Sequence, residues 1–326
     1  MSNIAPPPGA RDGQRMQGFS LPIRLANFVK LPHTVFALPF ALIGVLIASA
    51  HHRVTVPMVG WIVLAFTAAR FAAMGFNRIV DREVDAVNPR TAMRELPRGT
   101  LSVAQARLSV VFAGLVFVFA SSRLNPLCLL LSPVALLWTL GYSYTKRFTR
   151  WSHLWLGLGL SIAPVGGYLA VTGAWSDPWW MLGVLALAVV TWTGGFDILY
   201  ALQDAEFDRT HGLHSVPSAM GVSRAISLSR VLHAITVACL GLLVLADPFG
   251  LDGMADRAGP IAGRVDGILW LGVALVAVLL VWEHRLVKPT DLSKVDAAFF
   301  TMNGIISIGF LLVVAAARFV ANGLLA

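Results

Sequence analysis

The chain has 326 residues, of which 57% are hydrophobic and only 13% are charged, and its formal net charge is +8. Soluble domains carry roughly 25% charged residues, because polar side chains must cover their cores. The composition therefore argues against a soluble enzyme, a secreted disulfide scaffold and a disordered chain. The two cysteines, Cys128 and Cys239, lie in apolar blocks, where we expect free thiols in the membrane rather than a disulfide or a metal pair.

The N-terminal segment precedes the first apolar block. Residues 1–18 contain three consecutive prolines and no apolar core of a signal peptide, so they predict a flexible lead before a single domain over residues 19–326. Residues 19–32 place apolar side chains around Arg24 and Lys30. Two interpretations fit this segment: a short helix at the membrane surface, or an unstructured lead into the first membrane span.

Apolar stretches of bilayer-spanning length recur along the rest of the chain. A membrane helix needs roughly 20 predominantly apolar residues. We therefore expect an all-α fold, a polytopic membrane bundle of nine transmembrane helices. The expected spans cover residues 33–50, 56–76, 102–122, 126–142, 153–173, 178–200, 224–246, 267–283 and 295–320.

The Lys and Arg residues are distributed unequally between the two ends of these spans. Twenty of the 25 fall on the side of the N-terminus, and five fall on the other side. Cytoplasmic loops of membrane proteins carry such an excess. This pattern explains the net charge better than a nucleic-acid partner does. It predicts a multi-pass protein of the inner (plasma) membrane with a cytoplasmic N-terminus and an external C-terminus.

Two clusters of acidic residues follow the second and the sixth predicted spans, on the predicted cytoplasmic side. Acids one helical turn apart repel each other unless a cation lies between them, and Mg²⁺ binds carboxylate and phosphate oxygens together with water. The matching spacing favours two metal-binding faces over two solvated helix ends paired with neighbouring arginines. Each cluster has residues at i, i+4 and i+8: Asn77, Asp81 and Asp85 in the first, and Tyr200, Asp204 and Asp208 in the second, with Asp197 two turns before Asp204.

Short segments around the two clusters also resemble each other. A Gly-Phe pair precedes each cluster, at Gly75 and at Gly195. Ser102 and Ser223 lie where the following helices are expected to begin and are predicted to be their N-caps. An internal repeat of helix bundles and a coincidence of common loop residues explain these similarities equally well.

A third polar feature ends the fourth predicted span. Lys146 lies one helical turn beyond Tyr142 and on the same face. An ammonium group and a phenol hydroxyl at that depth could neutralise an anionic leaving group. On its own, the pair fits an interfacial anchor somewhat better, because Tyr and Lys are common at membrane edges.

Together these features predict an enzyme that acts on a lipid diphosphate. The diphosphate would bind at the cytoplasmic face, where Mg²⁺ and Lys146 take up its charge as it leaves. The allylic carbon then becomes cationic and needs a dry pocket with aromatic side chains, until an aromatic nucleophile attacks it. The alternative of a different class is an ion-coupled secondary transporter, whose acids would lie near the middle of the bilayer. A non-catalytic lipid-binding scaffold would not need two acidic faces.

The motifs resemble those of the UbiA superfamily of intramembrane prenyltransferases, over nearly the whole chain from about residue 20. The resemblance implies a nine-helix bundle with a cytoplasmic-facing active site, Mg²⁺ as cofactor, and transfer of a polyprenyl group from its diphosphate to an acceptor. Three segments carry it: Asn77-x-x-x-Asp81-x-x-x-Asp85 with Arg90-Thr91, Tyr200-Ala-x-x-Asp204-x-x-x-Asp208, and Tyr142-x-x-x-Lys146.

The resemblance implies a role for each residue that matches a motif, and the predicted site extends to their neighbours. The metal ligands would be Asn77, Asp81, Asp85, Asp204 and Asp208, and the four aspartates would be catalytic together with Lys146. The diphosphate and the acceptor would be bound by Asn77, Tyr142, Lys146, Tyr200, Asp197 and Lys30, with Arg90 and Arg94 on a loop that closes over the site.

Local sequence narrows the predicted acceptor within the superfamily. Segments 33–41, 72–78, 88–91 and 212–217 resemble the menaquinone branch, which acts on 1,4-dihydroxy-6-naphthoate. They also resemble the 4-hydroxybenzoate enzymes of ubiquinone synthesis, many of which have Pro where this chain has Glu95. We therefore expect 1,4-dihydroxy-6-naphthoate as the acceptor, with 4-hydroxybenzoate as the alternative. The expected partners are these two substrates and the lipid bilayer, with no obligate protein partner.

Overall fold

The computed structural model describes residues 18, 20–30, 34–249, 255–289, 291–292, 295 and 298–323. Within these residues the chain is helical, apart from loops and an isolated bridge between Lys288 and Asp291. The all-α fold class is confirmed. The predicted N-terminal lead, apart from Gly18, lies outside the described residues.

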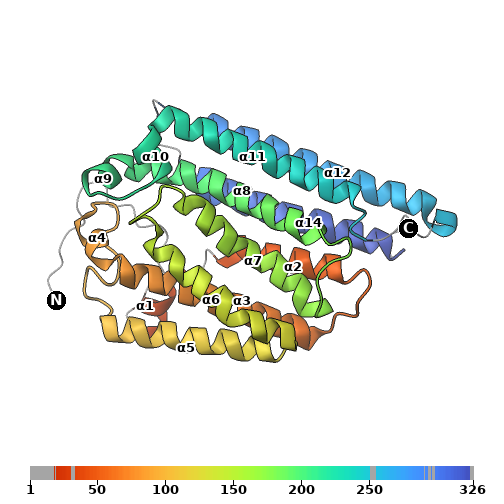
Figure 1. The fold of residues 1–326 in the computed structure, drawn as a ribbon, viewed down its shortest axis with the longest axis horizontal. Coiled ribbons are helices and arrows are strands. Elements are labelled where there is room, and N and C mark those ends of the chain that lie inside the picture. The colour runs from red at the N-terminus through yellow and green to blue at the C-terminus, as the bar shows by residue number, and fades with distance from the viewer. Residues whose placement is uncertain are drawn as a thin grey trace.

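In the described part of the chain, nine long helices form a bundle close to the positions that hydropathy predicts (Figure 1). Eight of them are long and apolar enough to cross a membrane, and α2 has a shorter apolar part. The long helices are α2 (Thr34–Ala48), α3 (Val56–Val80), α5 (Val103–Ser122), α6 (Pro126–Thr145), α7 (Ser152–Thr172), α8 (Met181–Ala201), α11 (Val222–Leu245), α12 (Ala255–Leu286) and α14 (Asn303–Ala321).

Short helical segments connect the long helices. One of them, α1 (Leu21–Phe28), favours the helical interpretation of the N-terminal segment. The last predicted span starts later than expected, because a π-helical turn over Ala298–Met302 precedes α14. The remaining short segments are α4 (Arg82–Val87), a 3₁₀ turn (Leu202–Asp204), α9 (Ala205–Thr210) and α10 (Val216–Met220).

The helix α8 lies in the middle of the bundle (Figure 1). It packs between α7 and α11, while α2 packs on α7 and α14, and α3 packs on α5 and α6. The span that contains α8, Met181–Thr210, is 72% buried inside the protein, whereas the other candidate spans are 11% to 50% buried. The helix that carries the second acidic cluster is therefore shielded by its neighbours.

The outward faces of the bundle are apolar. Leu108 and Phe112 on α5 and Leu137 on α6 are exposed, as expected for side chains that contact lipid rather than water. Both cysteines are free thiols within long helices: Cys128 is half-buried and Cys239 is buried. This agrees with the prediction of unpaired, membrane-embedded thiols.

Capping residues mark where several helices begin. Ser102 and Gln105 form a capping box in which each side chain accepts a hydrogen bond from the other residue's N–H at 3.1 Å. The prediction of an N-cap at Ser223 is wrong, because α11 begins at Val222, directly after Gly221, and Ser223 lies within the helix. Gly221 has a φ of 81°, a conformation that suits glycine, and turns the chain directly from α10 into α11. Ser215 caps α10 instead.

Candidate active site

Both acidic clusters lie at the same end of the bundle, at the C-terminal ends of α3 and α8 (Figure 1). The first cluster continues from α3 into α4, and the second from α8 into α9. Asp85, Asp204 and Asp208 are buried. A hydrogen bond joins the residue after α4 to the second cluster, since the side-chain amide of Asn88 donates to Oδ1 of Asp204 at 3.2 Å. The structure thus brings together the acids that the spacing singled out.

Each cluster lies across a bend rather than on one straight helix. α3 ends at Val80, and the φ of -91° and ψ of 6° of the next residue, Asp81, leave the helical region. Helical hydrogen bonds nevertheless continue, because the N–H of Asp81 donates to the carbonyl of Asn77 at 2.9 Å and that of Asp85 to the carbonyl of Asp81 at 2.7 Å. In the second cluster, Asp204 ends the 3₁₀ turn before α9. The structure thus corrects the prediction that each set of acids shares the face of one straight helix. The spacing of one helical turn between neighbouring acids is kept.

Every motif aspartate is paired with a basic side chain. Charges that are removed from water are stable only when paired, and here arginine supplies three of the four partners. The site therefore combines carboxylates that could bind a cation with guanidinium and ammonium groups that could bind an anion. The four pairs are Asp81 with Arg147 at 3.0 Å, Asp85 with Arg94 at 2.7 Å, Asp204 with Arg90, and Asp208 with Lys146 at 3.6 Å.

Arg90 bridges the loop after α4 to the second cluster. Its Nε donates to Oδ1 of Asp204 at 3.0 Å, its Nη2 makes a close contact with Oδ2, and its Nη1 donates to the hydroxyl of Tyr200 at 2.9 Å. On the same loop, both carboxylate oxygens of Asp85 accept hydrogen bonds from Arg94 at 2.7 and 2.8 Å. The two arginines that were predicted on this loop therefore contact acids of both clusters, Arg94 in the first and Arg90 in the second.

Lys146 follows the last residue of α6 and faces the second cluster. Its Nζ lies 3.6 Å from Oδ2 of Asp208, a buried oxygen without a hydrogen-bond partner. Tyr142, one turn earlier, lies within electrostatic reach of Asp81, Asp197 and Asp208. The backbone of Lys146 is held as well, because its carbonyl accepts a hydrogen bond from the N–H of His214 at 2.7 Å.

The electrostatic environment keeps Lys146 charged. Burial alone would lower the pKa of Lys146, but the carboxylates of Asp208, Asp204 and Asp197 outweigh burial, and the pKa is raised. For Asp81 the balance goes the other way: burial raises the pKa of its carboxyl group, and Arg147 only partly offsets this effect. The neighbouring carboxylates therefore favour the charged ammonium form of Lys146.

The carboxylates are suitable ligands for Mg²⁺, but they do not form a complete binding site by themselves. Among the described residues, no three His, Cys, Asp or Glu side chains lie close enough to hold a metal ion together. Mg²⁺ commonly binds one or two carboxylates and completes its octahedron with water and substrate phosphates. The two acids of each cluster fit this arrangement, as does the Asp208 oxygen that has no hydrogen-bond partner. The residues present would thus hold Mg²⁺ together with a phosphate-bearing ligand.

Three residues of this site were not predicted from the sequence. Arg147 contacts Asp81, and Asn88 contacts Asp204. His153 lies 2.7 Å from the carboxylate of Asp197, at the start of α7. One signal was available: Arg147 follows the predicted site residue Lys146 directly. The acids that these three residues contact, however, lie 44 to 116 positions away in the sequence, so the contacts themselves depend on the fold.

Lys30 occupies a different setting from the other predicted site residues. It follows α1, and its φ is 47°, an uncommon conformation for a residue other than glycine. The neighbouring carbonyl of Val29 accepts a hydrogen bond from Arg70 on α3 at 3.2 Å, which anchors the end of α1. The assignment of Lys30 to the substrate site stays a prediction.

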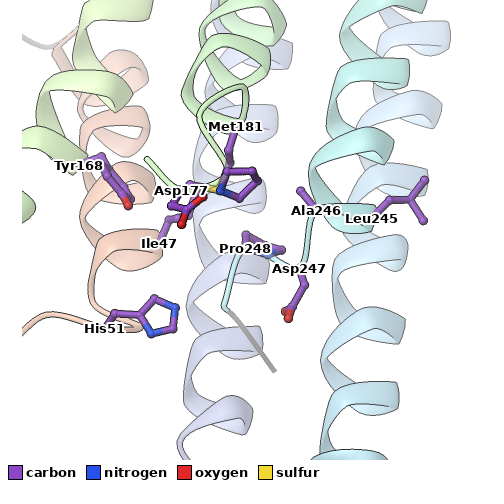
Figure 2. A pocket seen from close by; sticks show the side chains of 10 residues that line it. Ile47, His51, Tyr168, Asp177, Met181, Leu245, Ala246, Asp247 and Pro248 are labelled. Carbon is purple, nitrogen blue, oxygen red and sulfur yellow. The ribbon is translucent and has the colours of Figure 1, made fainter. Parts of the chain in front are cut away.

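A separate cavity of about 380 Å³ lies at the opposite end of the bundle (Figure 2). Ile47, Tyr168, Met181 and Leu245 line it, together with the exposed His51. Met181 begins α8, whereas the second acidic cluster follows the end of that helix. This cavity contains none of the motif residues and is distinct from the candidate active site.

Comparisons with known proteins agree with this arrangement. The UbiA prenyltransferase family model matches residues 37–305. The chain is 30% identical over 263 residues to the 4-hydroxybenzoate solanesyltransferase of Synechocystis sp., covering 78% of this chain and 80% of that protein. It is 30% identical over 228 residues to the 4-hydroxybenzoate octaprenyltransferase of Shewanella frigidimarina, covering 70% and 72% of the two chains.

Solved structures show the same fold. The apo structure of a UbiA homolog from Aeropyrum pernix K1 superposes with a TM-score of 0.74 at 30% identity, covering 88% of this chain and 96% of that chain. A UbiA homolog from Archaeoglobus fulgidus bound to GPP and Mg²⁺ has a TM-score of 0.69 at 20% identity, covering 90% and 99%. The family match spans most of the sequence and includes both acidic clusters, so this chain belongs to the UbiA prenyltransferase family of membrane enzymes.

Proposed function

We propose that this chain transfers a polyprenyl group from polyprenyl diphosphate to a ring carbon of 4-hydroxybenzoate, in a reaction that depends on Mg²⁺. One observation carries the proposal: two acidic clusters and four basic side chains meet at one end of an apolar helix bundle. A diphosphate with bound Mg²⁺ matches this combination of charges, since it presents anionic oxygens and a cation together.

The diphosphate would take over the basic side chains that now pair with the acids. Arg90, Arg94, Arg147 and Lys146 would then bind phosphate oxygens, and Asp81, Asp85, Asp204 and Asp208 would be free to hold Mg²⁺ with Asn77. Bound there, Mg²⁺ would neutralise charge on the leaving diphosphate. Lys146 supports the same step, because its ammonium group would pair with the diphosphate as it leaves.

A column of aromatic rings leads from this site into the bundle. Phe299, in the π-helical turn before α14, lies 4.1 Å from Tyr200 and 5.3 Å from Phe196, measured between ring centroids. Phe196 continues to Trp192 at 4.7 Å, and Trp192 to Phe40 at 4.8 Å. Ring faces stabilise a cation, and apolar walls exclude the water that would quench it. We therefore assign the polyprenyl chain and its allylic carbon to this column.

The chemical step breaks the bond between the allylic carbon and the diphosphate oxygen. The electron pair of that bond leaves with the diphosphate, the allylic carbon bonds to the acceptor ring, and the attacked ring carbon gives its proton to water or to the released diphosphate. An electron-rich phenol is the nucleophile that this step needs. We assign the aromatic acid to the end of the column at Tyr200, whose hydroxyl accepts a hydrogen bond from Arg90 at 2.9 Å.

The choice of acceptor follows the relatives rather than the local sequence. Sequence analysis ranked 1,4-dihydroxy-6-naphthoate first, whereas the similar proteins are named as 4-hydroxybenzoate octaprenyl- and solanesyltransferases. We therefore rank 4-hydroxybenzoate first, which places the chain in ubiquinone-type rather than menaquinone synthesis. The bacterial relatives also support our placement in the inner membrane. We assign the acidic clusters to the cytoplasmic side of that membrane, as the distribution of Lys and Arg predicts.

A transfer assay tests the proposal directly. Membranes containing the protein are incubated with Mg²⁺ and a radiolabelled polyprenyl diphosphate, with 4-hydroxybenzoate and 1,4-dihydroxy-6-naphthoate offered separately. We expect labelled product with 4-hydroxybenzoate, and none when Mg²⁺ is chelated. Product with the naphthoate alone would overturn the proposed acceptor. Absence of product with either, while the protein remains folded, would overturn the proposed reaction.

A further inference from the structure

A buried histidine outside the sequence motifs joins three parts of the proposed site. His153 is the second residue of α7, and its side chain is 0% exposed. Its Nδ1 lies 2.7 Å from Oδ2 of Asp197 on α8, and its Nε2 lies 3.2 Å from the backbone N of Val216, at the start of α10. Both ring nitrogens are therefore engaged within the protein.

These two contacts fix the tautomer of His153. A backbone N–H can only donate, so Nε2 must accept the hydrogen bond from Val216 and carries no proton. The proton of the neutral ring then resides on Nδ1, which donates to the carboxylate of Asp197. His153 therefore acts as a donor to one partner and an acceptor from the other, and neither nitrogen is left to act on a substrate.

Both partners of His153 lead to Lys146. Asp197 is 14% exposed and is one of the carboxylates that raise the pKa of Lys146. Val216 follows the loop in which the N–H of His214 donates to the carbonyl of Lys146 at 2.7 Å. Nδ1 of His153 thus orients the carboxylate of Asp197, which acts electrostatically on Lys146. Nε2 anchors the loop that holds the backbone of Lys146.

We infer that His153 is a positioning residue for the diphosphate site, an inference that rests on the proposed function. Through Nδ1–H it holds the carboxylate of Asp197 towards Lys146 and Tyr142, and through Nε2 it anchors the loop before α10. Asp197 thereby presents its carboxylate in a set position beside the proposed diphosphate site. The neutral Nδ1–H tautomer is part of this inference.

Two substitutions separate the two contacts of His153. In His153→Asn the side-chain amide can reach the position of Nδ1 and still donate to Asp197. In His153→Gln the longer side chain can reach the position of Nε2 and accept from Val216, while the donor to Asp197 is lost. Asp197→Asn removes the charge that His153 orients, and His211→Ala, at an exposed histidine after α9, is the matched control.

We expect weaker diphosphate binding in the variants that lose the contact between His153 and a charged Asp197. His153→Gln and Asp197→Asn should each raise KM for polyprenyl diphosphate about 10- to 100-fold, as expected for a hydrogen bond to a charged group. KM for the acceptor should stay within about threefold, a change of less than 1 kcal/mol. The double variant His153→Gln/Asp197→Asn should lose no more than either single variant, because the two residues act as one unit. His153→Asn should retain most of the binding.

Other outcomes would overturn the inference. Additive losses in the double variant would mean that His153 does not act through Asp197. Equal losses in His153→Asn and His153→Gln, with a parallel fall in thermal stability, would mean that His153 only supports the fold. ¹⁵N NMR of histidine-labelled protein in lipid tests the tautomer without any assay, and protonation at Nε2 would contradict it. If the unmodified protein transfers no prenyl group, the proposed function fails, whereas the tautomer and the stability of the variants still report on the His153 contacts.

Discussion

Asp81 and Asp204 have the same kinds of partner in the two clusters. Each accepts a hydrogen bond from a side-chain amide, Asn77 at 2.9 Å and Asn88 at 3.2 Å respectively. Each also accepts one from an arginine of another segment, in both cases at 3.0 Å. Equivalent contacts at residues 123 positions apart indicate two similar half-sites, which fits two cations that share one diphosphate.

Removal of one of these charges should stop the reaction. Asp81→Asn and Asp204→Asn keep the shape of the side chain but lose the negative charge that Mg²⁺ requires. We expect each to lower the transfer rate at least about 100-fold, as expected when a group that stabilises developing charge is lost. Initial rates over a range of Mg²⁺ concentrations measure this effect.

The matched controls are acids beside the motifs that point outward. Glu83 and Glu206 are 82% and 72% exposed and pair with Arg82 and Arg209. Their glutamine variants should transfer at the unmodified rate, because exposed ion pairs contribute little. Substantial Mg²⁺-dependent transfer by both aspartate variants would refute the metal assignment.

Lys146 should matter for the diphosphate more than for the acceptor. Lys146→Met removes the ammonium group but keeps most of the side-chain volume. We expect KM for polyprenyl diphosphate to rise about 10-fold or more, the equivalent of one charged hydrogen bond, while KM for the acceptor changes little. Steady-state kinetics with each substrate varied in turn measure both constants, and the exposed Arg150→Ala is the control. Equal changes in both constants would indicate a structural anchor instead.

At the scale of helices, the sequence predicted what depends on local composition. Span lengths follow from apolar runs, and so the nine predicted spans overlap the nine long helices of the described part of the chain. The bend at Asp81 and the start of α11 after Gly221 depend on single backbone conformations, which hydropathy does not register. The partners Arg147, Asn88 and His153 come from distant segments, and only the packed bundle brings them to the acids.

Close packing of α2 on α7 depends on glycine. A Cβ atom added at Gly167 would collide with the carbonyl oxygen of Ala41, whereas one added at Gly166 would meet nothing within 4 Å. Gly167→Ala should therefore lower stability by about 1–3 kcal/mol, because the backbones must separate. Gly166→Ala should be neutral or slightly stabilising, since alanine favours helix more than glycine does.

Thermal unfolding in detergent compares the two variants. Gly166 and Gly167 are neighbours in α7 and undergo the same substitution, so a difference between the variants reports on the contact with α2. Equal melting temperatures for both variants would show that α2 and α7 tolerate a wider separation than the structure has.

At the scale of the whole molecule, the paired charged side chains and the proposed active site lie at the same end of the bundle. The acidic clusters and their basic partners belong to the end where α4, α9 and α10 gather (Figure 1). The sequence analysis assigns the excess of Lys and Arg to the same end. The cavity at the other end has none of these pairs (Figure 2). Because cytoplasmic loops carry the positive excess, the sequence predicts that the diphosphate enters from the cytoplasm.

Cysteine labelling in intact bacterial cells checks this orientation. With Cys128 and Cys239 replaced by alanine, single cysteines are introduced at Glu206, at the acidic end, or at His52, an exposed residue of the loop between α2 and α3. A membrane-impermeant thiol reagent should label His52→Cys in intact cells, and Glu206→Cys only after the cells are opened. The inverse pattern would place the acidic clusters outside the cell, away from the side where positive residues are retained during insertion. Since Glu206 lies two residues from Asp204 and from Asp208, its labelling reports the side of the membrane on which the proposed active site opens.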